Sequence, residues 1–458
     1  MNTPTHIYFI GIGGIGMSAL ARYYKHAGVY VAGYDRTPSP LTVQLECEGI
    51  PIHYQDDIAQ IPLPVLQNCG GALVVYTPAI PSDHKEWNYL KQKGFQSIKR
   101  SRALGLIADT KKCLAVAGTH GKTTTSTLLA HIFTHSGVGC TAFLGGISKN
   151  YQTNLLLSHS PYLVAEADEF DRSFLQLHPQ MAVVTAVDAD HLDIFGDYHA
   201  VQDAFTDFVS QITPHGALVV KEGVHLPVPA TAPFQQYRYA LDQKSHFYAS
   251  NIMVEEKGFY RFSLHLLDTV VADCRLGIPG RINIENGVAA ASLAFLSGIA
   301  PDSIKASLAS FAGVSRRFDI QVSNPHSVYI DDYAHHPAEV SAALSSIRGM
   351  YPKRKITAIF QPHLFSRTRD FADSFGESLS LADELILLSI YPAREEPIEG
   401  VTSKMVLDKV KLSNKQLIEK EYVVDFLRTH PTDVLVTLGA GDIDRLVPAI
   451  KSLLEERP

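Results

Sequence analysis

The sequence predicts three α/β domains built on largely parallel sheets. A chain of 458 residues is too long for a single core and is typical of about three domains of ordinary size. Short apolar strands alternate with helical stretches, which is the pattern of parallel α/β domains. Hydrophobic residues make up 46% of the chain and charged residues 19%, as in a globular enzyme. We place the domains at residues 1–106, 107–314 and 315–458.

Each domain is expected to open with a buried strand that runs into a polar or glycine-rich turn. The strands are expected at residues 6–10, 29–34 and 72–76, at 113–116, 162–165 and 181–187, and at 327–331, 355–360, 384–390 and 433–438. Residues 216–276 contain short β-like pieces with Pro, Gln and aromatic residues, for which we expect antiparallel pairing. A helix rich in small residues is expected at 286–296.

The charge and cysteine content exclude some classes of protein. A net charge of -7 provides no general attraction to nucleic acid or anionic lipid. No apolar run reaches the ~18 residues of a membrane helix, so we expect no membrane insertion. Five Cys without C-x-x-C spacing, and a buried strand where a targeting peptide would stand, favour a cytoplasmic protein. A monomer and a homodimer are both compatible with the sequence.

The first glycine loop, Gly11-Ile12-Gly13-Gly14-Ile15-Gly16, directly follows the first strand and precedes a helical stretch. Glycines here allow the backbone to approach a pyrophosphate at the N-terminus of the helix. Asp35, at the end of the second strand, is placed to hold a ribose hydroxyl. The pattern predicts phosphate binding but fits NAD and a UDP-sugar equally well.

The second glycine loop, Gly118-Thr119-His120-Gly121-Lys122-Thr123-Thr124, lies between the strand at 113–116 and another helix. Its Gly-Lys-Thr core is that of a P-loop, in which Lys reaches the β/γ-phosphates and Thr ligates Mg²⁺. The match is imperfect, because the usual first glycine would fall on Val116.

Two groups of acids follow strands of the same predicted domain and could provide oxygen ligands for magnesium. They are Glu166, Asp168, Glu169 and Asp171, and Asp188, Asp190 and Asp193 with His191 among them. A solvated acidic loop and a structural histidine remain open alternatives.

Basic and polar turns follow the strands of the third domain. Arg316 and Arg317 lie in a Ser-Arg-Arg-Phe segment, and a guanidinium fork suits phosphate oxygens. The other turns are Asp331-Asp332-Tyr333-Ala334-His335-His336-Pro337, Gln361-Pro362-His363-Leu364-Phe365-Ser366-Arg367-Thr368-Arg369 and Thr437-Leu438-Gly439-Ala440-Gly441-Asp442. Three such turns at one sheet edge indicate a ligand-binding face, with structural capping as the alternative.

Together these segments resemble the Mur ligase family over nearly the whole chain. Further residues that carry the resemblance are Gly280-Arg281-Ile282-Asn283, Asn286 and Asp190-His191. The resemblance implies a Rossmann-like N-terminal domain, a P-loop-type central ATPase domain and a Rossmann-like C-terminal domain. It also implies an ATP- and Mg²⁺-dependent ligase that joins L-alanine to the carboxylate of UDP-N-acetylmuramate through an acyl phosphate.

The resemblance assigns roles to single residues. UDP-sugar contacts fall on Gly11, Gly13, Gly14, Ile15, Gly16, Asp35 and Thr77. ATP contacts fall on Gly118, Thr119, His120, Gly121, Lys122, Thr123, Thr124, Asn286, Arg317 and Asp332. The catalytic residues are Lys122, Glu166, His191 and Arg317, and the magnesium ligands are Thr123, Glu166 and His191. The amino acid is placed among Tyr333, His335, His363 and Arg367.

Some positions depart from the family pattern or bear on the choice of amino acid. Ala334 replaces an expected glycine, and Leu364 and Phe365 stand where an Arg-Tyr pair is common. Later-step members carry a modified lysine that is absent here, since no Lys lies between His191 and Lys221. This favours the alanine-adding step. A ligase that recycles the tripeptide, a regulatory ATPase and, more distantly, an NAD-dependent oxidoreductase remain alternatives.

Overall fold

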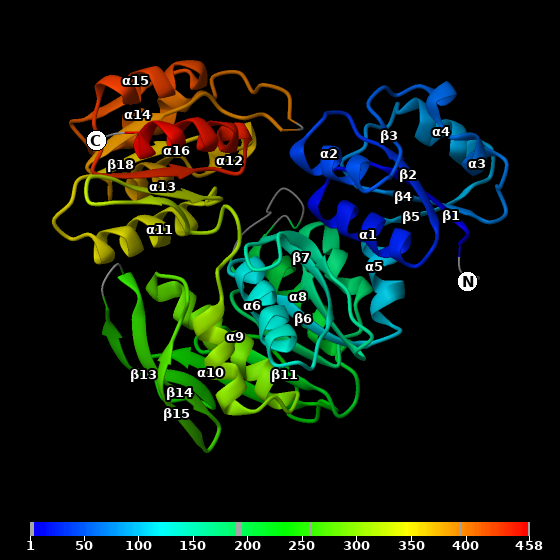
Figure 1. Cartoon of the computed structure of the whole chain (residues 1–458), viewed down its shortest axis with the longest axis horizontal. Helices are drawn as coiled ribbons and strands as arrows, with labels where there is room; N and C mark the ends of the chain where they lie inside the picture. The colour runs from blue at the N-terminus through cyan, green and yellow to red at the C-terminus, as the bar shows by residue number, and fades with distance from the viewer. Residues whose placement is uncertain (1–3, 189–194, 196, 256–257, 394, 457–458) are drawn as a thin grey trace. The chain divides into compact units, whose positions relative to one another are not determined.

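The computed structural model describes residues 4–188, 195, 197–255, 258–393 and 395–456. Their strands form three sheets (Figure 1). The chain divides into two compact units. The first consists of Met1–Asn251, Phe262–Cys274 and Glu285–Phe311, and the second of Ile252–Arg261, Arg275–Ile284 and Ala312–Pro458. Within the described ranges, no helix is both long enough and apolar enough to cross a membrane.

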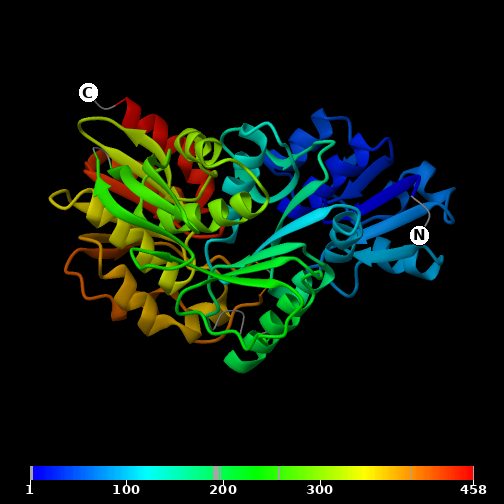
Figure 2. The same ribbon diagram turned by 90° about the horizontal axis from the view of Figure 1, so that it is seen from below.

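The N-terminal sheet has five parallel strands in the order β3-β2-β1-β4-β5. The strands are β1 (His6–Ile10), β2 (Tyr30–Tyr34), β3 (Ile52–His53), β4 (Ala72–Tyr76) and β5 (Gln96–Lys99). Helices α1 (Ile15–His26) and α5 (Arg100–Ala108) pack on one face, and α3 (Leu63–Leu66) and α4 (Lys85–Gln92) pack on the other (Figure 2). The helix α2 (Pro40–Cys47) follows β2. The strand order reverses at β1, which places the first glycine loop at the ligand-binding crevice of such sheets.

The central sheet has ten strands in the order β15-β14-β13-β12-β11-β10-β6-β9-β7-β8. The strands are β6 (Lys112–Ala117), β7 (Thr141–Ser148), β8 (Thr153–Leu156), β9 (Tyr162–Ala167), β10 (Met181–Val184), β11 (Ala217–Lys221), β12 (Gln235–Leu241), β13 (Phe247–Val254), β14 (Tyr260–Leu266) and β15 (Thr269–Arg275). The associated helices are α6 (Lys122–His135), α8 (Tyr198–Ser210), α9 (Arg281–Leu296) and α10 (Pro301–Ser310). Strands β6 and β9, which lead into the second glycine loop and the acids, are parallel neighbours.

The expectation of antiparallel pairing in residues 216–276 was wrong for three of the strands. β11, β12 and β13 pair in parallel. Parallel pairing usually needs a connection long enough to return to the same end of the sheet. Residues 222–234 provide one between β11 and β12, whereas only residues 242–246 connect β12 to β13. Two predicted element boundaries also differ from the structure. β10 ends at Val184 and not at residue 187, and α9 begins at Arg281 and not at residue 286.

The third sheet has the order β16-β17-β21-β18-β19-β20 and lies in the second unit. The edge strand β16 (Asp319–Ser323) is antiparallel to β17 (Val328–Asp332). The parallel strands are β17, β21 (Val434–Leu438), β18 (Ile356–Phe360), β19 (Glu384–Leu387) and β20 (Lys415–Leu417). The associated helices are α11 (Pro337–Met350), α12 (Phe365–Asp370), α13 (Ala372–Leu379), α14 (Ser403–Lys409), α15 (Val423–Thr429) and α16 (Val447–Glu455). The carboxyl ends of β17, β18 and β21 therefore meet at one edge, as the sequence predicted.

Candidate functional site

The first glycine loop brings together the residues that the sequence assigned to a UDP-sugar. Gly11 to Gly16 connect β1 to α1, and the backbone N–H of Gly13 donates to the Asp35 carboxylate at 2.7 Å. Thr77 follows β4, and its N–H donates to the carbonyl of Ile10 at 3.4 Å. Asp35 thus supports the loop itself, beside the N-terminus of a helix that attracts anions.

The second glycine loop connects β6 to the N-terminus of α6, where a phosphate cradle is predicted. Gly121 has φ +80°, which favours glycine, and a Cβ added there would lie 2.7 Å from Oδ1 of Asn286. Asn286, on α9, also accepts a hydrogen bond from the Thr125 hydroxyl of α6 at 3.3 Å. Asn286 therefore lies beside the loop, and its predicted contact with the adenine of ATP stays a prediction. Thr119 also contacts an acid of the second group, because its hydroxyl donates to Asp188 at 3.2 Å.

Lys122 is held at the start of α6 by groups of the same loop and by one acid. Its ammonium donates to the carbonyl of Gly118 at 2.7 Å and forms an ion pair with Glu169 at 2.8 Å. Burial disfavours its charged form, but the surrounding carboxylates, of which Glu169 contributes most, raise the pKa of Lys122 above its ordinary value. Lys122 is therefore a cation at neutral pH. The sequence interpretation included Glu169 among the acids but did not pair it with Lys122.

Thr123 and Glu166 form the core of the predicted magnesium site. The Thr123 hydroxyl donates to Glu166 at 3.2 Å, across from the end of β9. Both supply oxygen, and magnesium is bound through few protein oxygens, nucleotide phosphates and water. The two residues present thus fit a magnesium–nucleotide complex. No group of three or more His, Cys, Asp or Glu side chains within the described ranges is arranged to hold a metal ion by itself. The third predicted ligand, His191, lies outside the described residues, as do Asp190 and Asp193.

In the second unit, the two arginines that precede β16 lie beside the end of β17. Arg316 forms ion pairs with Asp331 at 3.6 Å and Asp444 at 3.1 Å, and donates to the carbonyl of Gly439 at 2.8 Å. It ties the turn after β21 to the end of β17. The guanidinium groups of both arginines also lie over the ring of Tyr333, at 4.6 Å from its centroid for Arg317 and 5.1 Å for Arg316. Arg316 thus has a structural role, and the phosphate contact predicted for Arg317 stays a prediction.

Asp332 at the end of β17 organises the same turn. Its carboxylate accepts the backbone N–H groups of Phe318 at 2.6 Å and Ala334 at 2.7 Å. Burial raises the pKa of Asp332 to about 6, although Arg317 and the two backbone donors oppose the shift. At neutral pH it is a carboxylate, which is the form that would accept hydrogen bonds from a ribose.

The residues predicted to bind the amino acid adjoin one another at the carboxyl ends of β17 and β18. The ring of His335 lies 5.3 Å from that of Tyr333 and 5.9 Å from that of His363. Burial lowers the pKa of His335 to about 4; Glu339 opposes this, and the nearby Arg367 adds to it. The imidazole is therefore neutral at pH 7.

Tyr391 extends this group and was missed by the sequence interpretation. Its ring stacks on His363 at 5.8 Å, and its carbonyl accepts the N–H of Leu364 at 3.0 Å. Leu364 is buried with φ +70°, a strained conformation for a bulky residue. Such strain occurs most often at binding and catalytic sites. No pattern around residue 391 indicated a role, because the contact depends on the packing of β18 against β19.

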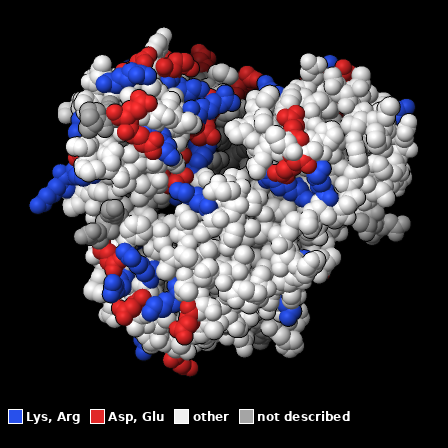
Figure 3. Space-filling model, in the orientation of Figure 1, with Lys and Arg blue, Asp and Glu red and all other residues white. Residues whose placement is uncertain are grey.

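Charged side chains of both signs are interspersed on the face shown in Figure 3, and they do not gather into one extended basic surface there. The positive groups described above are local to the glycine loops and to the turns of the third sheet.

Comparisons with known proteins agree with these three sheets. Family models described as the Mur ligase family catalytic domain, the Mur ligase middle domain, and the Mur ligase glutamate ligase domain match residues 6–112, 116–294 and 316–441. The UDP-N-acetylmuramate–L-alanine ligase of Parabacteroides distasonis is 49% identical over 455 residues, which cover 99% of this chain and 98% of that protein. The ligase of the same name from Phocaeicola vulgatus is 49% identical over 459 residues and is covered completely, as is this chain.

Solved structures show the same architecture. The UDP-N-acetylmuramate–alanine ligase of Thermotoga maritima superposes with a TM-score of 0.83 at 26% identity, covering 99% of this chain and all of that one. A murein peptide ligase of Psychrobacter arcticus, 23% identical, shares the fold with a TM-score of 0.71 over 99% of each chain. The predicted fold of three α/β domains is thus confirmed, and the chain belongs to the Mur ligase family.

Proposed function

We propose that this protein joins L-alanine to the carboxylate of UDP-N-acetylmuramate with hydrolysis of ATP to ADP and phosphate. The observation that carries the proposal is the second glycine loop, where Lys122, Thr123 and Glu166 meet at the start of α6. Relatives of nearly half-identical sequence and full length carry the name of this ligase. Family membership favours this reading over an NAD-dependent oxidoreductase and a regulatory ATPase.

The reaction begins with activation of a poor electrophile. A carboxylate oxygen of the sugar acid attacks the γ-phosphorus of ATP, the bond to the bridging oxygen of ADP breaks, and an acyl phosphate forms. Lys122 would neutralise charge on the transferred phosphoryl group, and Thr123 and Glu166 would hold magnesium. Magnesium, when bound, supplies Lewis-acid charge stabilisation. Gly118 to Thr124 would cradle the phosphates, with Asn286 beside the adenine.

In the second step the alanine nitrogen attacks the acyl carbon and phosphate leaves. We assign Tyr333, His335, His363 and Arg367 to the amino acid, with the Arg367 fork on its carboxylate. His191 and His335 are the candidate acceptors for the amine proton. Arg317 would contact phosphate oxygens, and Asp332 the ATP ribose.

We assign UDP-sugar binding to residues 1–106, ATP binding to 107–314 and amino-acid binding to 315–458. The diphosphate would lie at Gly11, Gly13, Gly14, Ile15 and Gly16, with Asp35 and Thr77 around the nucleoside. All five cysteines are free thiols, and two of them, Cys47 and Cys69, are exposed, which supports a reducing, cytoplasmic location.

The test is product mass after incubation with ATP, Mg²⁺ and UDP-N-acetylmuramate. L-Alanine, glycine, D-glutamate and the stem tripeptide are offered separately, and ADP is measured in parallel. The proposal expects one new amide with L-alanine and little or none with D-glutamate or the tripeptide, whose extra groups need space and partners. Ligation of the tripeptide alone would identify a recycling ligase instead.

A further inference from the structure

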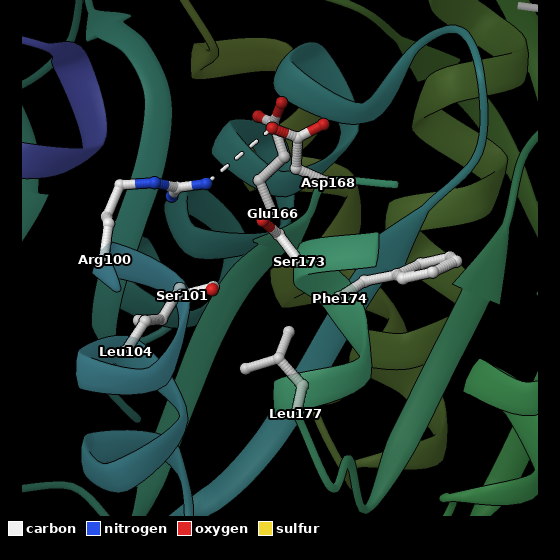
Figure 4. Close-up of a pocket in the computed structure, with 8 residues that line it drawn as sticks. All are labelled: Arg100, Ser101, Leu104, Glu166, Asp168, Ser173, Phe174 and Leu177. Carbon is white, nitrogen blue, oxygen red and sulfur yellow. Dashed lines mark ion pairs between the residues drawn. The ribbon is translucent and has the colours of Figure 1, made fainter. Parts of the chain in front are cut away.

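A cavity lies between the first turn of α5 and the end of β9, within the first unit. The space between its lining residues is about 230 Å³ including open solvent, and its enclosed part is about 10 Å³, which is room for about one water molecule. It is lined by Arg100, Ser101, Leu104, Glu166, Asp168, Ser173, Phe174 and Leu177. Figure 4 shows the guanidinium of Arg100 pointing toward the carboxylates of Glu166 and Asp168, with the leucines at the other end. One wall therefore carries a proposed magnesium ligand.

Arg100 also reaches the first glycine loop. A Cβ added at Gly16 would lie 2.8 Å from Nη1 of Arg100 and 3.2 Å from its Cδ. The guanidinium therefore packs directly against the first turn of α1, where the absence of a side chain makes room for it. Arg100 is a charged group that adjoins the predicted diphosphate site on one side and the acids of β9 on the other.

The guanidinium of Arg100 forms few polar contacts with the described residues. Its ion pair with Asp168 measures 3.8 Å, which is too long for a hydrogen bond. Arg100 donates no side-chain hydrogen bond to any residue in the part of the chain that the structure describes. A guanidinium has five N–H donors in a planar fork that fits carboxylate and phosphate oxygens. The neighbouring Lys99 differs, because its ammonium is satisfied by Asp171 at 2.7 Å.

We propose that Arg100 binds an anionic group of the sugar-acid substrate at the solvent-open side of this cavity. The inference rests on the proposed function, which requires the substrate to extend from the first glycine loop to the phosphoryl-transfer site at Glu166. A carboxylate approaching Glu166 and Asp168 meets negative charge, and Arg100 supplies the compensating cation. The anion is either the diphosphate or the sugar-acid carboxylate, both of which suit a guanidinium fork.

Calorimetric titration of the full chain with UDP-N-acetylmuramate and with UDP-N-acetylglucosamine shows which anionic group, the diphosphate or the carboxylate, contacts Arg100. The second ligand has the diphosphate but lacks the carboxylate. Arg100→Gln should weaken binding of UDP-N-acetylmuramate by about 10- to 100-fold, as expected for loss of a charge-assisted hydrogen bond. An equal loss of affinity for both ligands would show that Arg100 binds the diphosphate. A loss of affinity for UDP-N-acetylmuramate alone would show that it binds the carboxylate. Arg100→Lys should recover part of the affinity.

Two further variants distinguish binding from a structural effect. Lys99→Gln removes the adjacent cation and should leave both affinities unchanged. Asp168→Asn removes the ion-pair partner and should tighten binding, because a negative charge facing the cavity is lost. If Arg100 acted only through Asp168, Asp168→Asn would weaken binding as Arg100→Gln does, and the inference would fail.

Unchanged affinity in a folded Arg100→Gln protein, as judged by its thermal unfolding, would also overturn the inference while leaving the proposed function intact. Wild-type protein that binds neither UDP-sugar would overturn both together.

Discussion

At the scale of single residues, the Lys122–Glu169 ion pair is the contact that the proposed nucleotide binding would change. Glu169 is 1% exposed and holds the ammonium that would otherwise meet the β/γ-phosphates. With ATP bound as proposed, its phosphates and the Glu169 carboxylate would therefore compete for one cation. Glu169→Gln should tighten ADP binding about 10-fold, because it removes both the competitor and a repulsive charge, in keeping with charged hydrogen bonds of roughly 1.5–3 kcal/mol.

The same substitution should lower the stability of the nucleotide-free protein, because it leaves a largely buried ammonium without its principal counter-charge. Calorimetry with ADP and thermal unfolding without it measure the two effects on one preparation. Asp171→Asn is a suitable control, since Asp171 pairs with the distant Lys99. Weaker ADP binding by Glu169→Gln would show that Glu169 supports the bound nucleotide instead of competing with it.

At the scale of elements, the helix α6 that carries Lys122 contains a buried histidine. His131 is 3% exposed and bonds through Nδ1 to the Tyr151 hydroxyl at 2.9 Å and through Nε2 to the Ser310 hydroxyl at 3.0 Å. Burial, with a smaller contribution from His135, lowers the pKa of His131 to about 4 from 6.5. Between these values the unfolded chain binds a proton that the folded chain does not, so stability falls as pH drops from 6.5 to 4.

His131→Gln cannot titrate in this window, and its loss of stability between pH 6.5 and 4 should be smaller than that of wild type by roughly 1–3 kcal/mol. The measurement is denaturant unfolding at a series of pH values, compared as differences between the two proteins. Acids elsewhere titrate in both proteins and cancel. An identical pH slope would mean that His131 takes up its proton in the folded state near its ordinary pKa.

The sequence predicted much of the fold and the local parts of the site, for identifiable reasons. Units of strand, glycine loop and helix depend on residues that are neighbours in the sequence. The loops Gly11–Gly16 and Gly118–Thr124 could therefore be predicted from the sequence alone. Contacts between residues far apart in the sequence could not be predicted in this way. Asn154, for example, donates to the carbonyl of Ile15 at 2.6 Å and thereby ties β8 to the first glycine loop. Arg100 was missed for the same reason, because its neighbours Gly16 and Asp168 are distant in sequence.

At the scale of the whole molecule, the two glycine loops imply separate ligand sites in one chain. Each ligand that binds only the folded protein stabilises it by RT ln(1 + [L]/Kd), about 2.7 kcal/mol at 100 times its Kd. Both UDP-N-acetylmuramate and ATP with Mg²⁺ should therefore raise the Tm of wild type. Lys122→Ala removes the cation of the second loop only. If it weakens ATP binding by 100-fold, the same ATP concentration contributes only about 0.4 kcal/mol, and the ATP shift nearly disappears.

The UDP-N-acetylmuramate shift should persist in Lys122→Ala, because Lys122 contacts Gly118, Thr119 and Glu169 and no residue of the first loop. This retained shift also shows that the variant is folded. Loss of both shifts would mean that Lys122 supports the fold or that one site serves both ligands. An undiminished Tm shift with ATP would show that the nucleotide does not bind at the second loop. Lys122 could then not be the cation of the acyl-phosphate mechanism. Only the selective loss of the ATP shift fits a chain that binds its two phosphorylated substrates on two different glycine loops.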